Sequence, residues 1–514
     1  MPGLFGEDPA TDQPPPMLRE GEVLVRVAVE RGIDRLGSAS ANARRSALAG
    51  GAAAPDPTDT GPPDDGALTY RAMMPIAVGD RVEVPLGRAN RPEPGIVVEV
   101  GGAGEAELAE GLGTAKLKSI FPPKRKGALG SGGAGDGGVS GVAAAALPPD
   151  LVELARWMAS YYVCPLGMVL ATMLPAAVKH DTGAKLRTVL APLDEPALTA
   201  HLATAKLTPS AKRAWESIAA LDPSTFPIGA RDLATTIDSR TLAPINSLVR
   251  IGLLVASQRR EIVAPEWDDL SVEGSPSSSS SSPLPIPHSP LPSLAPHQSR
   301  AVSGISTSLD SFSVHLLRGV TGSGKTEVYL RLIADVLRRG KTALVLVPEI
   351  SLTPQTAGRF QRRFGAGSAC TATVAVLHSG LTASQRHQQW ALAARSAESG
   401  GAGVVIGARS AVFAPLRNLG LVVVDEEHAG DYKQDQLPRY HGRDVAIKRA
   451  QAAGCPIILG SATPSIESWA NATGPSAKYK LWELTSRVGG GALPHVEVLD
   501  LVAERRAAAE LAAQ

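Results

Sequence analysis

The 514-residue sequence has only three cysteines, few aromatic residues and no excess of charge of either sign. Cys164, Cys370 and Cys455 lie far apart and form no C-x-x-C pair, which argues against a disulfide framework and against a cysteine zinc site. Aromatic residues make up 4% of the chain, too few for an extended base-stacking platform, and the formal net charge is +1. Any binding of nucleic acid must therefore depend on local patches.

The sequence also lacks long apolar runs. It contains no stretch of 18 apolar residues, and its first residues have neither the basic region nor the apolar core of a signal peptide. We therefore expect a cytoplasmic protein without a membrane segment.

Three stretches of low complexity interrupt the regular patterning. Residues 37–66 are rich in Ala, Gly, Pro and Asp, residues 127–141 are nearly all Gly, Ala and Ser, and residues 274–292 join a serine run to a proline-rich run. Such segments cannot bury enough apolar surface to offset the entropy lost on ordering. We predict a disordered insert near 37–66 and flexible linkers at 127–147 and 266–293.

The segments between them differ in periodicity. Alternation with period two at 23–29 and 80–86, followed by a run at 95–100, predicts a small β domain within residues 1–126. Helical spacing begins near residue 150. Three short helices are expected in 210–251, and two short apolar runs at 253–255 and 261–263 are expected to form a hairpin, which together predict a winged-helix domain at 148–265. The pattern does not distinguish a DNA binder from a spacer.

From residue 294 to residue 514 the pattern is that of an α/β lobe. Short apolar strands alternate with helices, which is typical of a parallel sheet covered on both faces. Ligands of such sheets bind at the carboxyl ends of the strands. The expected strands are 314–317, 343–347, 374–377, 404–406, 421–424 and 457–459.

A phosphate-binding loop follows the first of these strands. Residues 319–326 read GVTGSGKT, which matches G-x-x-x-x-G-K-[ST] between a strand and a helix. Glycines let backbone N–H groups turn toward phosphate oxygens, while Lys325 would reach the β- and γ-phosphates and Thr326 would bind Mg²⁺. The predicted nucleotide-binding residues of this loop are Gly319, Thr321, Gly322, Ser323, Gly324, Lys325 and Thr326.

Two further motifs follow later strands. Asp425 and Glu426 come directly after the apolar strand 421–424, where Asp425 would hold Mg²⁺ and Glu426 would polarise the attacking water. The alternative for three successive acids is a solvated acidic turn. Ser461 and Thr463 follow the strand 457–459, and with His428 they are candidates for coupling. P-loop, D-E-x-H and S-A-T in this order indicate a superfamily 2 helicase or translocase.

Several long runs resemble the PriA family of replication-restart helicases. The runs are GVTGSGKTEVYL at 319–330, LVPEISLTPQ at 346–355, LHSGL at 377–381, IGARSAVFAP at 406–415, VVVDEEH at 422–428, RYHGRD at 439–444 and LGSATPSIES at 459–468. The resemblance implies a RecA-like helicase lobe at 294–514, preceded by a β domain that binds 3′ DNA ends and by a winged helix. It also implies ATP and Mg²⁺ as cofactors, with Gln298 reading the adenine.

The same resemblance implies 3′-to-5′ unwinding of stalled forks during primosome assembly. Forked and single-stranded DNA, primosome proteins and single-stranded DNA-binding protein would be the partners, at the nucleoid. Tyr70, Gly87 and Lys118 would form the 3′-end pocket. Other contacts to single-stranded DNA would come from Pro348, Glu349, Ser351, Arg409, Ser410, Tyr432 and Tyr440.

The sequence departs from the family pattern at its C-terminus. Family members continue into a cysteine-rich zinc module and a second RecA-like lobe, whereas this sequence stops at Gln514 with three scattered cysteines. We therefore expect a C-terminally incomplete chain without a zinc site, inactive as a motor by itself. Two alternatives stay open: a different superfamily 2 translocase, and a fork-binding, protein-recruiting module that does not unwind.

Overall fold

The structure is a computed structural model of the whole chain. It describes residues 23–30, 66–73, 75–87, 89–101, 117–121, 146–193, 198, 207–262, 292–365, 368, 370–398, 403–488 and 500–505. The predicted insert near 37–66 and the predicted linkers at 127–147 and 266–293 lie almost entirely outside the described residues.

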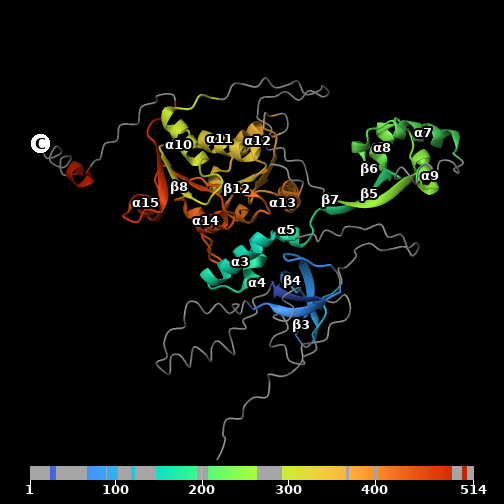
Figure 1. The fold of residues 1–514 in the computed structure, drawn as a ribbon, viewed down its shortest axis with the longest axis horizontal. Helices are drawn as coiled ribbons and strands as arrows, with labels where there is room; N and C mark the ends of the chain where they lie inside the picture. The colour runs from blue at the N-terminus through green and yellow to red at the C-terminus, as the bar shows by residue number, and fades with distance from the viewer. Residues whose placement is uncertain are drawn as a thin grey trace, which may run out of the picture.

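A seven-stranded parallel sheet forms the centre of the C-terminal lobe (Figure 1), as the strand pattern predicted. Its spatial order is β10-β11-β9-β12-β13-β8-β14. The strands are β8 Val314–Gly319, β9 Thr342–Leu346, β10 Thr373–Leu377, β11 Gly403–Gly407, β12 Leu419–Val424, β13 Ile457–Ser461 and β14 Tyr479–Leu484. The sequence analysis did not predict β14, which pairs with β8 at the edge of the sheet.

Helices cover both faces of this sheet because the strands are apolar on both sides. On β12, Leu421 and Val423 belong to one buried cluster while Val422 and Val424 belong to another. The first cluster also contains residues of α10 Pro296–Ser306, α11 Lys325–Arg338 and α12 Pro354–Phe364. The second contains residues of α13 Ala383–Glu398 and α14 Gly442–Ala452. A further helix, α15 Ile466–Thr473, follows β13.

A buried histidine on β8 binds a tryptophan of the neighbouring edge strand β14. His315 is fully buried, its Nδ1 accepts a 3.0 Å hydrogen bond from Trp482 Nε1, and its Nε2 lies 2.9 Å from Ser313 Oγ. Trp482 donates to Nδ1, so the ring is neutral with its proton on Nε2. Burial, together with nearby Lys480, lowers the pKa of His315 to about 4.

Acid is expected to destabilise the lobe through His315. Its folded pKa lies below the usual 6.5, so the unfolded chain binds more protons between about pH 6.5 and pH 4, and the stabilisation present above 6.5 is lost as the pH falls. The loss should reach roughly 3 kcal/mol near pH 4. Denaturant unfolding across this range should show a shallower pH dependence for His315→Asn. Equal slopes in both proteins would contradict the assignment.

An antiparallel sheet forms the N-terminal unit. Its order is β2-β1-β4-β3, with β1 Val23–Val29, β2 Leu68–Ala72, β3 Arg81–Leu86 and β4 Arg91–Val100. Gly79 precedes β3 with φ +95°, and a Cβ at this position would lie 1.8 Å from the carbonyl oxygen of Leu147. Glycine is therefore required where the chain returns to this sheet after the undescribed residues 122–145.

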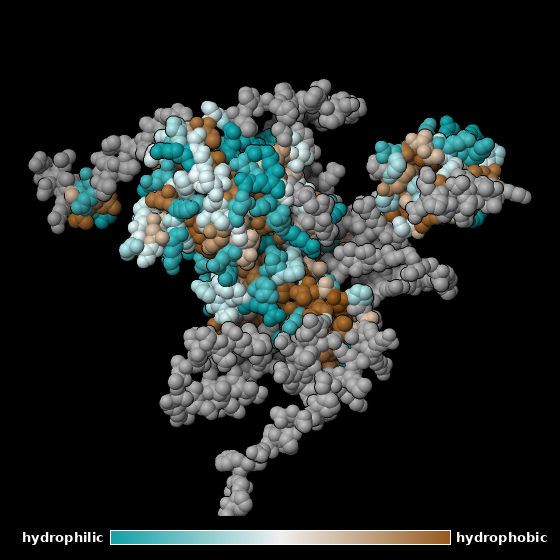
Figure 2. Space-filling model, in the orientation of Figure 1, coloured by the Kyte–Doolittle hydropathy of each residue, from teal (hydrophilic) through white to brown (hydrophobic). Residues whose placement is uncertain are grey.

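Three helices follow this sheet in the sequence, and two of them pack against both it and the parallel-sheet lobe. α3 Pro149–Tyr161 and α4 Leu166–Met173 bury residues in one cluster with Ile96 of β4 and Val422 of β12. Apolar residues gather around α4 and the short α5 Ala176–Lys179 in the space-filling view (Figure 2). We therefore propose that α3 to α5 belong with the first domain, which was predicted to end at residue 126, and not with the winged-helix domain that was predicted to begin at residue 148.

The winged-helix segment contains the three expected helices, but its hairpin prediction was wrong. The helices are α7 Pro209–Ala219, α8 Ala230–Thr236 and α9 Ala243–Ile251. Residues 253–255 and 261–263 were expected to pair, whereas β7 Leu254–Ile262 is one continuous strand. It pairs along its length with β5 Ala184–Pro192, and β5 also pairs with β6 Ile228–Gly229. No Gly, Asn or Asp interrupts residues 254–260, so the chain lacks the residues that favour the positive φ values of a two-residue hairpin turn.

No helix in the described part of the chain has the length and apolar character needed to cross a membrane.

Candidate functional site

The P-loop connects β8 to α11 as the motif predicted. Gly322 and Gly324 have φ values of +80° and +82°, a conformation that side chains with a Cβ rarely adopt. Lys325 is 8% exposed, and its Nζ donates a 2.9 Å hydrogen bond to the carbonyl oxygen of Gly319. The same Nζ lies 3.6 Å from Glu426 Oε1, so the lysine already bridges the P-loop and the end of β12.

Gln298 supports the P-loop from α10. Its Oε1 accepts a 2.9 Å hydrogen bond from the backbone N–H of Ala295, and its Nε2 donates a 2.9 Å bond to the carbonyl oxygen of Ser323. The side chain is buried. Both ends of the amide therefore bind protein, and this geometry supports a role in holding the loop more directly than the predicted contact to adenine.

The loop fits a phosphate group with its metal. Ser323 Oγ is buried and has no hydrogen-bond partner among the described residues, which is expected for a hydroxyl that faces a ligand's place. Thr326 lies in the first turn of α11, and Asp425 follows β12 at the same edge of the sheet. Hydroxyl and carboxylate oxygens are the ligands that Mg²⁺ prefers, so these two residues would hold it.

Asp425 receives hydrogen bonds at two of its groups. Tyr329 Oη donates to Asp425 Oδ1 at 2.9 Å, and Tyr432 Oη donates to the carbonyl oxygen of Asp425 at 2.6 Å. Burial, followed by the charge of Glu426, raises the pKa of the Asp425 carboxyl, while the bond from Tyr329 and the charge of Lys325 oppose that rise. The carboxylate therefore depends on its neighbours to stay charged.

Glu426 has a strained backbone. Its φ is +45°, in the left-handed region that residues with a Cβ avoid. This conformation directs its carboxylate to Lys325 on one side and to His428 Nδ1, 3.7 Å away, on the other. Strain of this kind persists where the surroundings fix the conformation, which suits a residue that must orient a water molecule.

The S-A-T motif contacts the D-E-x-H motif directly. His428 Nδ1 lies 2.8 Å from Ser461 Oγ, and His428 Nε2 lies 3.5 Å from Thr463 Oγ1. Ser461 Oγ also accepts a 3.0 Å hydrogen bond from the backbone N–H of Thr463. The three residues predicted to couple the motifs are therefore in contact.

Glu427, which the sequence analysis did not single out, forms a buried network beside the site. Its fully buried carboxylate accepts from Arg443 Nη1 at 3.0 Å, from the N–H of Ser465 at 2.7 Å and from Ser468 Oγ at 2.8 Å. It thereby connects β12 to α14 and to the start of α15. Glu427 lies between the predicted catalytic residue Glu426 and the predicted coupling residue His428, and nothing in the sequence indicated that it would meet the separate S-x-x-S sequence at 465–468.

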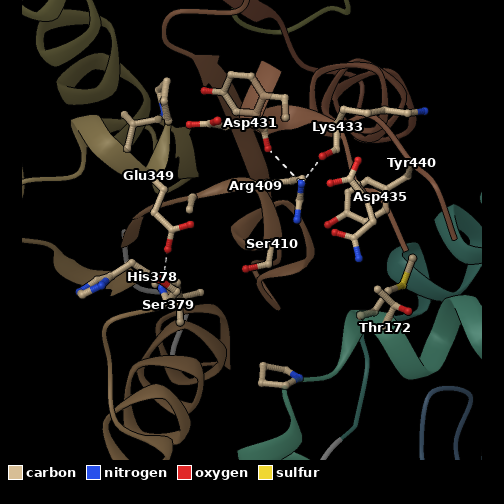
Figure 3. A pocket seen from close by; sticks show the side chains of 18 of the residues that line it. Thr172, Glu349, His378, Ser379, Arg409, Ser410, Asp431, Lys433, Asp435 and Tyr440 are labelled. Atoms are coloured by element: carbon tan, nitrogen blue, oxygen red, sulfur yellow. Dashed lines mark hydrogen bonds between the residues drawn. The ribbon is translucent and has the colours of Figure 1, made fainter. Parts of the chain in front are cut away.

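A cavity of about 580 Å³ lies next to this site, between the lobe and the helices that follow the first sheet (Figure 3). Thr172, Met173 and Pro175 line it from the helical side. The loops after β9, β10 and β11 line it from the lobe, together with the 3-10 helix Gly430–Tyr432. The predicted DNA contacts Pro348, Glu349, Arg409, Ser410, Tyr432 and Tyr440 all line it, and Ser351 lies in the adjoining turn Glu349–Ser351.

The two tyrosines predicted to contact DNA at this cavity expose almost no surface on which a base could stack. Tyr432 and Tyr440 are 0% and 2% exposed, respectively. Arg409 donates hydrogen bonds to the carbonyl oxygens of Asp431 and Lys433 and lies over the Tyr440 ring (Figure 3). The tyrosines therefore hold the loop, and through its hydroxyl Tyr432 connects the cavity to Asp425.

The three residues predicted to bind a 3′ end come from both edge strands of the N-terminal sheet and from the segment that joins them: Tyr70 lies on β2, Gly87 follows β3, and the chain after Lys118 hydrogen-bonds to both strands. Lys118 Nζ donates a 2.6 Å hydrogen bond to the carbonyl oxygen of Gly87, and the N–H of Arg71 donates to the carbonyl oxygen of Lys118. Tyr70, the neighbour of Arg71, is 3% exposed and packs in the sheet core. Gly87 and Lys118 are thus brought together, while the Tyr70 side chain is buried in the core of the sheet.

The cysteines belong to different parts of the fold. Cys164 and Cys455 are buried and Cys370 is half-buried, each as a free thiol. Burial raises the pKa of Cys455 to about 12. Within the described residues no group of three or more His, Cys, Asp or Glu side chains is arranged to hold a metal ion.

Two family models match the chain. The DEAD/DEAH box helicase model covers residues 295–471, which include the P-loop, Asp425, Glu426 and Ser461. The model of the 3′DNA-binding domain of PriA covers residues 141–175, which include α3 and α4.

Curated relatives match over longer stretches. The replication restart protein PriA of Bacillus subtilis (strain 168) is 42% identical over 287 residues, 55% of this chain and 32% of its own length. That of Chlamydia pneumoniae is 37% identical over 362 residues, 70% of this chain and 44% of its own length. That of Treponema pallidum is 50% identical over 213 residues, 41% of this chain and 30% of its own length. The chain belongs to the PriA family.

This PriA-family chain spans less than half the length of these curated relatives. Among solved structures, RecG bound to a three-way DNA junction is 25% identical and covers 39% of this chain and 25% of its own, with a TM-score of 0.27. That overlap supports no argument about function.

Proposed function

We propose that this PriA-family chain is the ATP- and DNA-binding part of a replication-restart helicase. The observation that carries the proposal is the meeting of Lys325, Asp425 and Glu426 at the carboxyl ends of β8 and β12. The cavity beside them is lined by the loops that follow the neighbouring strands. Nucleotide and DNA would thus bind next to each other on one sheet edge.

The residues of the site would have separate roles in binding the nucleotide and in its hydrolysis. Backbone N–H groups of the P-loop and Lys325 would bind the phosphates, and Thr326 and Asp425 would hold Mg²⁺, which stabilises charge on the β- and γ-phosphates. Glu426 would orient the attacking water and accept its proton. The contacts of His428 with Ser461 and Thr463 would couple a change at the nucleotide site to the loop that follows β13.

Arg409 and Ser410, with Pro348 and Glu349, would hold single-stranded DNA at the cavity through its backbone. Contacts of this kind position a strand without reading its sequence. The bond from Tyr432 to Asp425 supports coupling between DNA and nucleotide, because a shift of this loop would act on the Mg²⁺ site. Movement from 3′ to 5′, assembly with primosome proteins and single-stranded DNA-binding protein, and action at the nucleoid belong to the same proposal.

The DNA-binding part of the proposal is tested by asking whether the affinity for forked DNA depends on a free 3′ end. A fork with a free 3′ hydroxyl should bind about tenfold more tightly than the same fork with that end phosphorylated, because a pocket that fits a terminal hydroxyl has no room for the larger phosphate group. The salt dependence should be modest, since few phosphates are contacted. Fluorescence anisotropy with both forks measures the ratio.

Lys118→Met should remove this preference, since the Lys118 side chain holds the Gly87 turn. Lys212→Met, at an exposed lysine of α7, is the matched control and should retain it. Equal affinity of the parent for both forks would contradict the 3′-end pocket and leave the ATP site untouched.

A further inference from the structure

A buried tyrosine of the P-loop helix contacts the predicted Mg²⁺ residue. Tyr329 is 1% exposed and lies one turn of α11 after Thr326, so that both side chains share a face of the helix. Its Oη donates a 2.9 Å hydrogen bond to Asp425 Oδ1 across 96 residues of sequence. Phenylalanine would fill the same space, so the hydroxyl is the feature that needs an explanation.

The neighbouring strand leaves room for this hydroxyl. Gly460 lies on β13 opposite the bond, and a Cβ there would lie 1.7 Å from Tyr329 Oη and 3.2 Å from Asp425 Oδ1. No side chain larger than glycine therefore fits while the bond exists. α11, β12 and β13 thus meet at one hydroxyl–carboxylate contact.

The contact restrains a carboxylate that has competing partners. Lys325 Nζ lies near Glu426 and attracts any nearby anion, while Glu426 repels Asp425. A hydrogen bond to a carboxylate is directional, and the rigid tyrosine ring fixes where its hydroxyl points. The bond therefore selects one orientation of the Asp425 carboxylate without adding charge to the site.

We propose that Tyr329 is a positioning residue for the divalent cation of the nucleotide site. Its hydroxyl holds the Asp425 carboxylate in the orientation used toward Mg²⁺, and Gly460 provides the space for it. The inference rests on the proposed ATP site. It does not make Tyr329 a ligand of the metal or of the nucleotide.

A role limited to packing predicts a different result. If the hydroxyl only stabilised the core, Tyr329→Phe would lower the melting temperature and weaken nucleotide binding equally with and without Mg²⁺. A positioning role predicts that only the Mg²⁺-dependent part of nucleotide binding changes. The distinction does not require hydrolysis by the protein.

The experiment is a Mg²⁺ titration of the binding of a fluorescent ATP analogue, with a parallel measurement in EDTA. For Tyr329→Phe, the Mg²⁺ concentration at half-maximal effect should rise about tenfold, the usual consequence of losing one hydrogen bond to a charged group. The affinity in EDTA should stay within about twofold, since the P-loop and Lys325 are unchanged.

Tyr479→Phe is the matched control. Tyr479 lies on β14 opposite Val314, at the end of β8 that is far from the P-loop, and it should titrate like the parent. Gly460→Ala should shift the titration in the same direction as Tyr329→Phe, because its methyl group displaces the hydroxyl. If Gly460→Ala does not fold, Tyr329→Phe decides the question by itself, since it conserves the volume.

Two results would overturn the inference in distinguishable ways. If the parent binds no nucleotide, the proposed ATP site is wrong and the inference fails with it. If the parent binds nucleotide but Tyr329→Phe and Tyr479→Phe have the same Mg²⁺ midpoint, the ATP site remains and the positioning role of Tyr329 is wrong.

Discussion

Lys325→Ala is expected to abolish nucleotide binding, with a loss of affinity of at least about 100-fold. Lys325 is 8% exposed and its Nζ is held by Gly319 and faces Glu426, so its charge is fixed where the phosphates would bind. Charge-assisted hydrogen bonds contribute roughly 1.5–3 kcal/mol each, and a phosphate group would take more than one from this ammonium. Isothermal titration calorimetry with an ATP analogue and Mg²⁺ measures the effect.

The control for this variant is Lys478→Ala, which removes an exposed lysine of the same lobe. It should bind nucleotide like the parent, and both variants should melt near the parent and retain the affinity for forked DNA. Undiminished nucleotide binding by Lys325→Ala would show that the P-loop assignment is wrong. Fork binding that is indifferent to nucleotide in the parent would instead favour the recruiting module over the helicase.

Glu427→Ala is expected to destabilise the lobe by about 3–5 kcal/mol, the usual cost of removing one partner of a buried ion pair. The variant would leave Arg443, whose side chain is 12% exposed, without its partner, and the N–H of Ser465 and the hydroxyl of Ser468 without their acceptor. Each unsatisfied buried group adds to the cost. Urea unfolding followed by tryptophan fluorescence measures the loss.

The matched control is Glu467→Ala, an exposed acid in the first turn of α15. Its loss should be within about 1 kcal/mol, as expected for a charge near a helix N-terminus. A Glu427→Ala protein as stable as Glu467→Ala would mean that the network contributes no net stability. In that case the third acid of the D-E-E triplet would need another explanation.

The sequence by itself determined which residues form the proposed nucleotide site. The P-loop, the D-E-x-H motif and the S-A-T motif each consist of contiguous residues directly after an apolar strand. In a parallel sheet all such positions lie at one edge, so the three motifs were expected to lie near one another, and in the structure Lys325 lies near Glu426 and His428 near Ser461. The parallel α/β fold of the lobe followed from the same alternation of strands and helices.

Only the tertiary structure decided which distant side chains share a space. The Tyr329–Asp425–Gly460 contact joins three elements, and Tyr432, which was predicted to contact DNA, is buried with its hydroxyl bound to Asp425. Likewise, β7 pairs with β5, about 70 residues away in the sequence, instead of forming the predicted local hairpin. Periodicity reports which face of an element is buried, but it carries no information on what packs against that face. Those neighbours are set by the global fit of side chains in a dense interior.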